Sequence, residues 1–269
     1  MSRSDAVTAL RARVAGWQRH EAPAWPVVGL GLEETADSPA AGRLASGALH
    51  EVLPEAPADF AAAAGFALAI SSRILRVRDG HVLWVCPGAR GRRAGSLYPV
   101  GLAGFGIDPG RVVRVEASRP RDLLWSLEEA LSHASLAAVI GILADGDRSY
   151  DFTASRRLSM RAAQSGATAL LLGSRCGLDM ATASQTRWSV ASGPSAPAHY
   201  TGQAVPGLGS PRWQVRLVKS RAASLGLWEL EWNHETLSFR LAAPLAGRAP
   251  LRHAPGLVRE PAGGHWTAA

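Results

Sequence analysis

Short apolar runs alternate with amphipathic stretches over the middle of the chain. The runs that predict strands span residues 49–53, 81–86, 111–115, 136–143 and 168–172. The run 136–143 (LAAVIGIL) has no polar side chain, which is typical of a strand in a parallel sheet covered on both faces. Between the runs, apolar residues recur at helical spacing. These predicted helices span residues 59–76, 120–133 and 153–164.

After residue 185 the pattern changes to strands with alternating apolar and polar positions. These strands are predicted at residues 187–191, 213–221, 227–232 and 237–241. Alternation is typical of strands with one buried and one solvated face, so we expect them to extend the sheet in antiparallel fashion. The predicted fold class is therefore α/β, with a mostly parallel sheet flanked by helices and antiparallel C-terminal strands.

The two ends of the chain differ from this core, which spans residues 44–242. Residues 1–22 predict an amphipathic helix, Pro- and Gly-rich residues 23–43 predict a linker, and residues 243–269 predict a flexible tail. The apolar face of the helix consists of Val7, Leu10, Val14 and Trp17. We expect that face to pack either on the core of the same chain or on a partner. Trp266 in the tail either belongs to a partner-binding motif or has no binding role.

Composition fits one folded domain with short extensions. The chain has 269 residues, of which 47% are hydrophobic and 19% are charged. Cys86 and Cys176 are too few for a disulfide framework or a cysteine zinc site. No apolar run reaches the roughly 18–20 residues that a membrane span needs, and the N-terminus lacks an apolar signal core. We expect a cytoplasmic protein without a membrane partner.

The net charge of +7 comes almost entirely from arginine, because Lys219 is the one lysine of the chain. A P-loop, a Schiff base or a lysine general base would have to use Lys219. Basic residues concentrate in residues 90–121 and 212–221. Weak, sequence-independent DNA binding is one interpretation of this charge, and a basic surface without a ligand is the other.

The first β–α junction is where a phosphate-binding loop would lie in such a fold. Residues 54–61 read PEAPADFA there. The prolines remove N–H donors, Glu55 and Asp59 repel phosphate, and glycine, lysine and hydroxyl groups are all missing from the segment. We therefore predict no nucleotide cofactor. Asp145 and Asp147 favour a turn, with a metal site as the alternative.

Several segments together carry a resemblance to a known family. They are ALHEVLPE (48–55), LAAVIGIL (136–143), RWSVASGPSAP (187–197) and RWQVRLVKSRAASLGLWELEW (212–232). In this order, behind an N-terminal helix and a linker, they resemble the ImuA family. Its members are RecA-related accessory factors of bacterial damage-induced mutagenesis, and the match to RecA itself is at the level of the fold.

The resemblance implies a RecA-like core in which the P-loop lysine falls at Phe60 and the metal aspartate at or near Leu143. It implies an adaptor of translesion synthesis rather than an enzyme. The adaptor would bridge ImuB, an error-prone DNA polymerase III α-type subunit, and RecA or DNA in the SOS response. A SulA-like cell-division inhibitor and a true ATPase are the alternatives.

No catalytic, cofactor-binding or metal-binding residue is assigned. Lys219 and Arg221 resemble the basic pair that in RecA reaches the nucleotide of the adjacent protomer. The candidate contacts with DNA or a partner are Arg90, Arg92, Arg93, Arg148, Arg156, Arg157, Arg175, Arg187, Arg216, Lys219 and Arg221. The candidate partner-docking residues are Val7, Leu10, Val14, Trp17 and Trp266.

Overall fold

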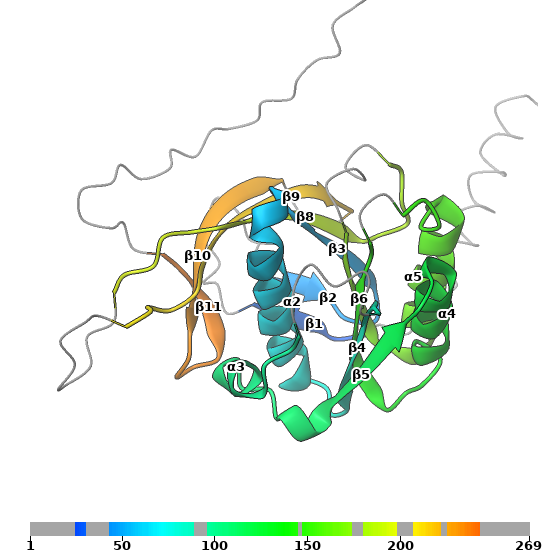
Figure 1. Cartoon of the computed structure of the whole chain (residues 1–269), viewed down its shortest axis with the longest axis horizontal. Helices are drawn as coiled ribbons and strands as arrows, with labels where there is room; N and C mark the ends of the chain where they lie inside the picture. The colour runs from blue at the N-terminus through cyan, green and yellow to red at the C-terminus, as the bar shows by residue number, and fades with distance from the viewer. Residues whose placement is uncertain are drawn as a thin grey trace, which may run out of the picture.

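A nine-stranded mixed sheet forms the centre of the protein, with the strand order β11-β10-β9-β8-β3-β7-β6-β4-β5 (Figure 1). The computed structural model describes residues 25–30, 43–88, 96–144, 147–173, 180–197, 207–221 and 225–242. Strands β3 to β8 pair in parallel, whereas β9, β10 and β11 follow β8 in antiparallel pairing. The prediction that residues 187–191 are antiparallel was wrong, because β8 pairs in parallel with β3 and is buried over most of its length. The predicted fold class is confirmed.

The strand bounds lie close to the predicted apolar runs. The parallel strands are β3 (Leu49–Pro54), β4 (His81–Pro87), β5 (Val112–Ala117), β6 (Leu136–Ile142), β7 (Thr168–Leu172) and β8 (Thr186–Ser192). The antiparallel strands are β9 (Arg212–Ser220), β10 (Gly226–Asn233) and β11 (Ser238–Leu241). A separate two-stranded sheet pairs β1 (Val27–Gly29) with β2 (Arg43–Ala45), so part of the predicted linker is a strand.

Helices cover the two faces of the sheet unequally (Figure 1). Helix α2 (Phe60–Leu75) packs on one face, and α4 (Pro120–Ala130) and α5 (Phe152–Ser165) pack on the other. Helix α4 contacts β4, β5 and β6, whereas α5 contacts β3 and β7. Among the described residues, the antiparallel strands therefore have a helix on the α2 face only. Shorter elements are η1 (Pro57–Asp59), α3 (Pro99–Gly104) and η3 (Pro109–Arg111).

Local sequence signals explain where these helices begin and end. The carboxylate of Asp151 accepts the backbone N–H of Ala154 at 2.7 Å and so caps the start of α5. The same helix ends at Gly166, whose φ of 79° is a left-handed conformation that glycine adopts without strain. Pro57 opens the 3-10 turn that leads into α2.

Aromatic side chains fill the layer between α2 and the antiparallel strands. Phe66 of α2 lies 5.9 Å from the rings of both Trp188 and Trp213 and 5.3 Å from that of Phe239, measured between ring centroids. The alanines of α2 let this helix approach the sheet closely, and the indole N–H of Trp213 donates to the backbone oxygen of Ala62 at 2.9 Å. The tryptophans of the late strands thus form core.

The helical stretch Pro57–Leu75 is long and apolar enough to cross a membrane by length and composition, and it is the one such stretch in the described residues. The apolar side chains of this stretch pack in the core of the protein. Phe66, Ile70 and Ile74 are fully buried against the sheet. Core packing therefore accounts for the hydropathy of this helix.

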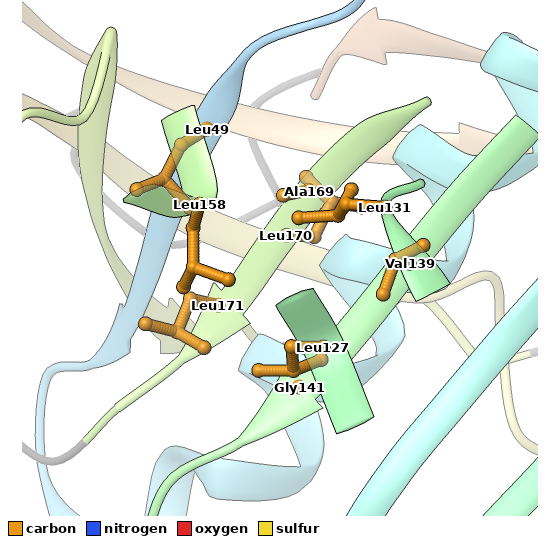
Figure 2. A pocket seen from close by; sticks show the side chains of 9 residues that line it. All are labelled: Leu49, Leu127, Leu131, Val139, Gly141, Leu158, Ala169, Leu170 and Leu171. Atoms are coloured by element: carbon orange, nitrogen blue, oxygen red, sulfur yellow. The ribbon is translucent and has the colours of Figure 1, made fainter. Parts of the chain in front are cut away.

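Leucines dominate the layer between the sheet and helices α4 and α5. They surround a small cavity whose walls include Leu49, Leu127 and Leu158 (Figure 2). Gly141 of β6 lies in the same wall, and a Cβ atom on it would stand 2.5 Å from a methyl carbon of Leu127 and 3.0 Å from one of Leu171. The absence of a side chain at Gly141 thus lets α4 lie close to β6.

We expect Gly141→Ala to lower the free energy of unfolding by about 1–3 kcal/mol, because the added methyl overpacks the layer. Leu127→Ala removes the clashing side chain and is expected to cost about 2–5 kcal/mol as a cavity. The double variant should cost less than the sum of the two by about 1 kcal/mol or more, since each change relieves the defect of the other. Urea denaturation of the four proteins measures this coupling, and additive losses would contradict it.

Candidate functional site

The junction between β3 and α2 is occupied by hydrogen bonds to its own carboxylates. Ser192 donates its backbone N–H and its hydroxyl to Asp59 Oδ1 at 2.9 and 2.8 Å. Ala56 donates its N–H to Asp59 Oδ2 at 3.1 Å, and the hydroxyl of Ser189 donates to Glu55. The acids that the sequence places here thus join the end of β3 to the end of β8.

Electrostatics at this junction oppose phosphate binding. Partial burial raises the pKa of the Asp59 carboxyl, but the hydrogen bonds from Ser192 and Ala56 outweigh it and hold the pKa below its ordinary value. The junction therefore carries negative charge at neutral pH. Its backbone N–H donors point at these carboxylates. A phosphate cradle instead requires N–H donors that point outward, toward the ligand.

At the positions where the resemblance places the P-loop lysine and the metal aspartate, this chain has apolar side chains that pack in the core layers. Phe60 is half-buried against the α2 layer, and Leu143 is half-buried against the α4–α5 layer. Asp147 accepts the N–H of Ser149 at 2.8 Å, the geometry of a turn. Asp145 lies outside the described residues, and the part of the chain that is described holds no group of three metal-ligating side chains.

A buried ionic cluster lies beside this junction, on the α5 side of the sheet. Its centre is Glu51 of β3, whose side chain is 3% exposed. The carboxylate accepts hydrogen bonds from Arg187 Nε and from the hydroxyl of Tyr150, both at 2.5 Å, and from the hydroxyl of Ser184 at 3.2 Å. Three segments distant in sequence therefore meet at one carboxylate.

The guanidinium of Arg187 extends the cluster into the chain that precedes β8. Its Nη2 donates to the backbone oxygen of Met180 at 2.9 Å and to the hydroxyl of Thr182 at 3.1 Å. Burying a charged pair is favourable only when further hydrogen bonds satisfy the remaining donors and acceptors. The contacts with Met180 and Thr182 supply such bonds.

The one lysine of the chain belongs to the same cluster. Lys219 Nζ donates to the backbone oxygen of Thr182 at 2.6 Å and to the hydroxyl of Ser184 at 3.2 Å. A bulge in the pairing of β8 with β9 sets Lys219 opposite Arg187, while Leu217 on the other side of the bulge faces Trp188. Without the extra residue, Lys219 would point to the α2 face, because side chains alternate along a strand.

Burial shifts the titration of the groups around Glu51. Burial, together with the charge and hydrogen bond of Glu51, raises the pKa of the Tyr150 phenol far above its usual value. Burial also lowers the pKa of the Lys219 ammonium, while the charge of Glu51 acts in the opposite direction. The hydrogen bonds of the cluster hold residues 180–187 against β3 and β9.

A neutral histidine lies on the opposite side of β3. The ring of His50 is fully buried, with Nε2 2.7 Å from the backbone oxygen of Ala45 and Nδ1 2.7 Å from the hydroxyl of Thr186. A carbonyl only accepts, so Nε2 carries the proton. Trp188 donates its indole N–H to the same hydroxyl at 2.8 Å, so Thr186 donates its own proton to Nδ1. Burial accordingly lowers the pKa of His50 to about 4.

The candidate contact residues fall into three groups. Arg187, a candidate contact with DNA or a partner, is 4% exposed and paired with Glu51, so its guanidinium is directed into the fold. Lys219 is half-buried and directs its ammonium inward. The candidates with exposed side chains are Arg148, Arg156, Arg157, Arg216 and Arg221, of which Arg157 pairs with Glu128 at 2.8 Å.

The remaining candidates lie outside the described residues. They are Arg90, Arg92, Arg93, Arg175, Val7, Leu10, Val14, Trp17 and Trp266.

Sequence reasoning did not identify the polar cluster itself. A signal was present, because Glu51 interrupts an apolar strand predicted for the interior of a parallel sheet. A carboxylate at such a position requires a buried cationic partner. Arg187, in another predicted strand, was available for that role. Ser184, Thr182 and Tyr150 lie in or beside loops, where spacing gives no information about direction.

The fold and the junction define a class: a mixed-sheet α/β protein whose first β–α junction is closed by its own carboxylates. No family model matches the sequence. The chain is 34% identical to "Protein ImuA" of Caulobacter vibrioides strain NA1000 / CB15N over 219 residues, which is 76% of this chain and 84% of the relative. "Protein ImuA" of strain ATCC 19089 / CIP 103742 / CB 15 gives the same values. The chain belongs to the ImuA family.

The ionic cluster is expected to dominate the response to mutation on this side of the sheet. Glu51→Gln leaves the charge of Arg187 buried without its carboxylate, and we expect it to cost about 3–5 kcal/mol of unfolding free energy. Adding Arg187→Met removes that cation and should recover part of the loss. Urea denaturation measures both effects. The matched control, Glu235→Gln in the exposed turn before β11, should change stability by less than about 0.5 kcal/mol.

His50 predicts a loss of stability in mild acid. Its pKa is about 4 in the folded state against 6.5 for an unperturbed histidine, so the unfolded state binds more protons between those values. Stability therefore falls as pH falls through this window, by about 2 kcal/mol between pH 7.5 and pH 5. His50→Gln can keep both hydrogen bonds without titrating. Unfolding curves at the two pH values should show a correspondingly smaller loss in the variant, and equal losses would contradict the assignment.

Proposed function

We propose that this chain is a non-catalytic adaptor of damage-induced mutagenesis with a RecA-like core. In this role it bridges ImuB, an error-prone DNA polymerase III α-type subunit and RecA in the translesion synthesis of the SOS response. Its mechanism is assembly rather than turnover. Membership of the ImuA family supports the process, and the closed β3–α2 junction is the observation that carries the non-catalytic role.

The argument against nucleotide turnover rests on several independent features of that junction. Pro54 and Pro57 lack N–H donors, and Glu55 and Asp59 bring negative charge to the place where phosphate would bind. Ser189 and Ser192 donate to those acids, so opening the junction for a nucleotide would also separate β3 from β8. Breaking these bonds would oppose binding in addition to the charge repulsion.

Exposed aromatic side chains are the features that best fit an adaptor. Trp125 on α4 is 66% exposed and Tyr98 before α3 is 68% exposed. Aromatic residues gain more from burial at an interface than other side chains, because they bury a large area with few rotatable bonds. We take Trp125 and Tyr98 as the first candidates for contact with a protein partner.

Direct DNA binding is a weaker part of this proposal. Arg216 and Arg221 remain exposed, but the other candidates Arg187 and Lys219 are used within the fold. A protein that binds fewer phosphates has a lower affinity for DNA, and that affinity depends less on salt. Protein contacts therefore carry the proposed role, with DNA at most an auxiliary ligand.

The test combines capture of ImuB with damage-induced mutation frequency in a strain that lacks this gene. Wild-type protein should restore mutagenesis, and Trp125→Ser or Tyr98→Ser should weaken ImuB capture about tenfold or more and reduce mutagenesis with it. The matched control is Val77→Ser, which removes an apolar side chain of 50% exposure at the end of α2. Unfolding curves of all variants control for folding.

Other outcomes would overturn the proposal. Saturable ATP binding in a calorimetric titration of the wild-type protein would contradict the non-catalytic role. Filamentation on overexpression, without any effect on mutation frequency, would favour the cell-division inhibitor instead. Full capture and mutagenesis by both aromatic variants would remove Trp125 and Tyr98 as contacts.

A further inference from the structure

Strand β5 forms one end of the nine-stranded sheet, and within the described residues no strand pairs with its outer edge. The opposite end is different. There the backbone N–H of Phe239 in β11 donates to the oxygen of Leu30 at 3.0 Å, so the segment after β1 covers part of that edge. An open strand presents backbone donors and acceptors to another strand. β5 is therefore the edge of this sheet at which pairing can continue (Figure 1).

Hydrogen bonding to β4 shows which residues of β5 face outward. Gly88, just after β4, donates its N–H to the oxygen of Ala117 at 2.8 Å. The backbone groups of Ala117 thus point toward β4, and those of Val113 and Val115 do the same, because direction alternates along a strand. The backbone N–H and C=O groups of Val112, Arg114 and Glu116 consequently point to the open side.

The side chains of β5 divide between the two faces of the sheet. Val115 and Ala117 pack with the α4 layer, and Val113 on the same face is 46% exposed. Arg114 and Glu116 lie on the other face, with side chains 33% and 38% exposed and an ion pair of 2.5 Å between them. The strand therefore carries one cation and one anion two residues apart, on the residues whose backbone faces outward.

We propose that β5 is a homodimer interface, at which the β5 strands of two copies of this chain pair in antiparallel fashion around a two-fold axis at Val115. This register sets Arg114 opposite Glu116 of the second copy, and the symmetry repeats the pair. Both residues direct their backbone groups outward, so each pair also exchanges ladder hydrogen bonds. Val115 meets Val115 and Val113 meets Ala117 on the α4 face.

Charge selects this register over its neighbours. An axis at Arg114 would place the Arg114 side chains of the two copies opposite each other. An axis at Glu116 would do the same with the two Glu116 carboxylates. Like charges directly opposite each other destabilise a strand pair, whereas opposite charges stabilise it. An axis at Val115 alone pairs the outward backbone groups and opposes the charges correctly. The second copy fits this edge because the segment R-V-E (114–116) is complementary to its own reverse.

Sedimentation equilibrium of the full-length chain over a hundredfold range of concentration tests the pairing. The wild-type protein should show a reversible monomer–dimer equilibrium. Arg114→Glu and Glu116→Arg each place like charges across the axis, twice over, and should raise the dissociation constant about tenfold or more. Arg121→Glu, an equal charge reversal at an exposed position of α4, should leave it unchanged.

Two recombinations make the test specific to this register. The double variant Arg114→Glu/Glu116→Arg restores both cross-strand pairs and should return the dissociation constant to within about threefold of the wild-type value. A mixture of the two single variants should form a heterodimer, because each supplies the charge that the other lacks. Neither protein in the mixture keeps the ion pair within its own strand, so a gain on mixing reports pairing between copies.

A wild-type chain that stays monomeric over this range would overturn the proposal, as would single variants that dimerise as tightly as the wild-type. Failure of the mixture to form heterodimers would overturn the register. Urea midpoints equal to that of the wild-type would show that the variants are folded. The result is independent of the role in mutagenesis, because the measurement uses the purified chain alone.

Discussion

The ion pair between Glu51 and Arg187 joins the two halves of this protein. Glu51 lies in the parallel part of the sheet, and Arg187 lies in β8, the strand at which pairing changes from parallel to antiparallel. Both side chains are buried, so the pair tolerates the loss of neither partner. Tyr150, Ser184 and Lys219 complete the set of hydrogen bonds that stabilises the buried charges. The segment that leads into β8 and the bulge in β9 both take their conformation from this cluster.

The same arrangement explains how the first β–α junction of the sheet is held closed. β8 supplies Arg187 to one side and Ser189 and Ser192 to the end of β3, where they bind Glu55 and Asp59. The carboxylates of Glu55 and Asp59 occupy the place where a phosphate loop would bind its anion. Hydrogen bonds from the serines of β8 hold them there. In the proposed role, the protein acts through its surfaces rather than through this junction. The exposed aromatic groups and the open edge of β5 are such surfaces.

Much of the fold was predictable because its signals are local. The run LAAVIGIL became β6, and the alternating segments after residue 212 became the antiparallel strands β9 to β11, whereas β8 pairs in parallel with β3. The pair β1 and β2 was not predicted, because three-residue strands carry too short a pattern to read. At the candidate site, Phe60 and Leu143, where the resemblance places the P-loop lysine and the metal aspartate, pack against apolar side chains. The burial of Arg187, a candidate contact with DNA or a partner, was not predictable, because a basic residue in a strand has no sequence feature that shows which face it occupies.

Sequence alone determined the class of sheet, the helices that cover it and the unsuitability of residues 54–61 for phosphate. Each of these depends on residue types within a few positions of one another. The tertiary structure decided where the charges go. A single extra residue in β9 turns Lys219 to the face of Arg187, and Tyr150 and Ser184 reach Glu51 from 99 and 133 residues away in sequence. Side-chain direction along a strand reverses with every residue, so a change of one in the register moves a charge from one face to the other. Only the paired sheet fixes that register.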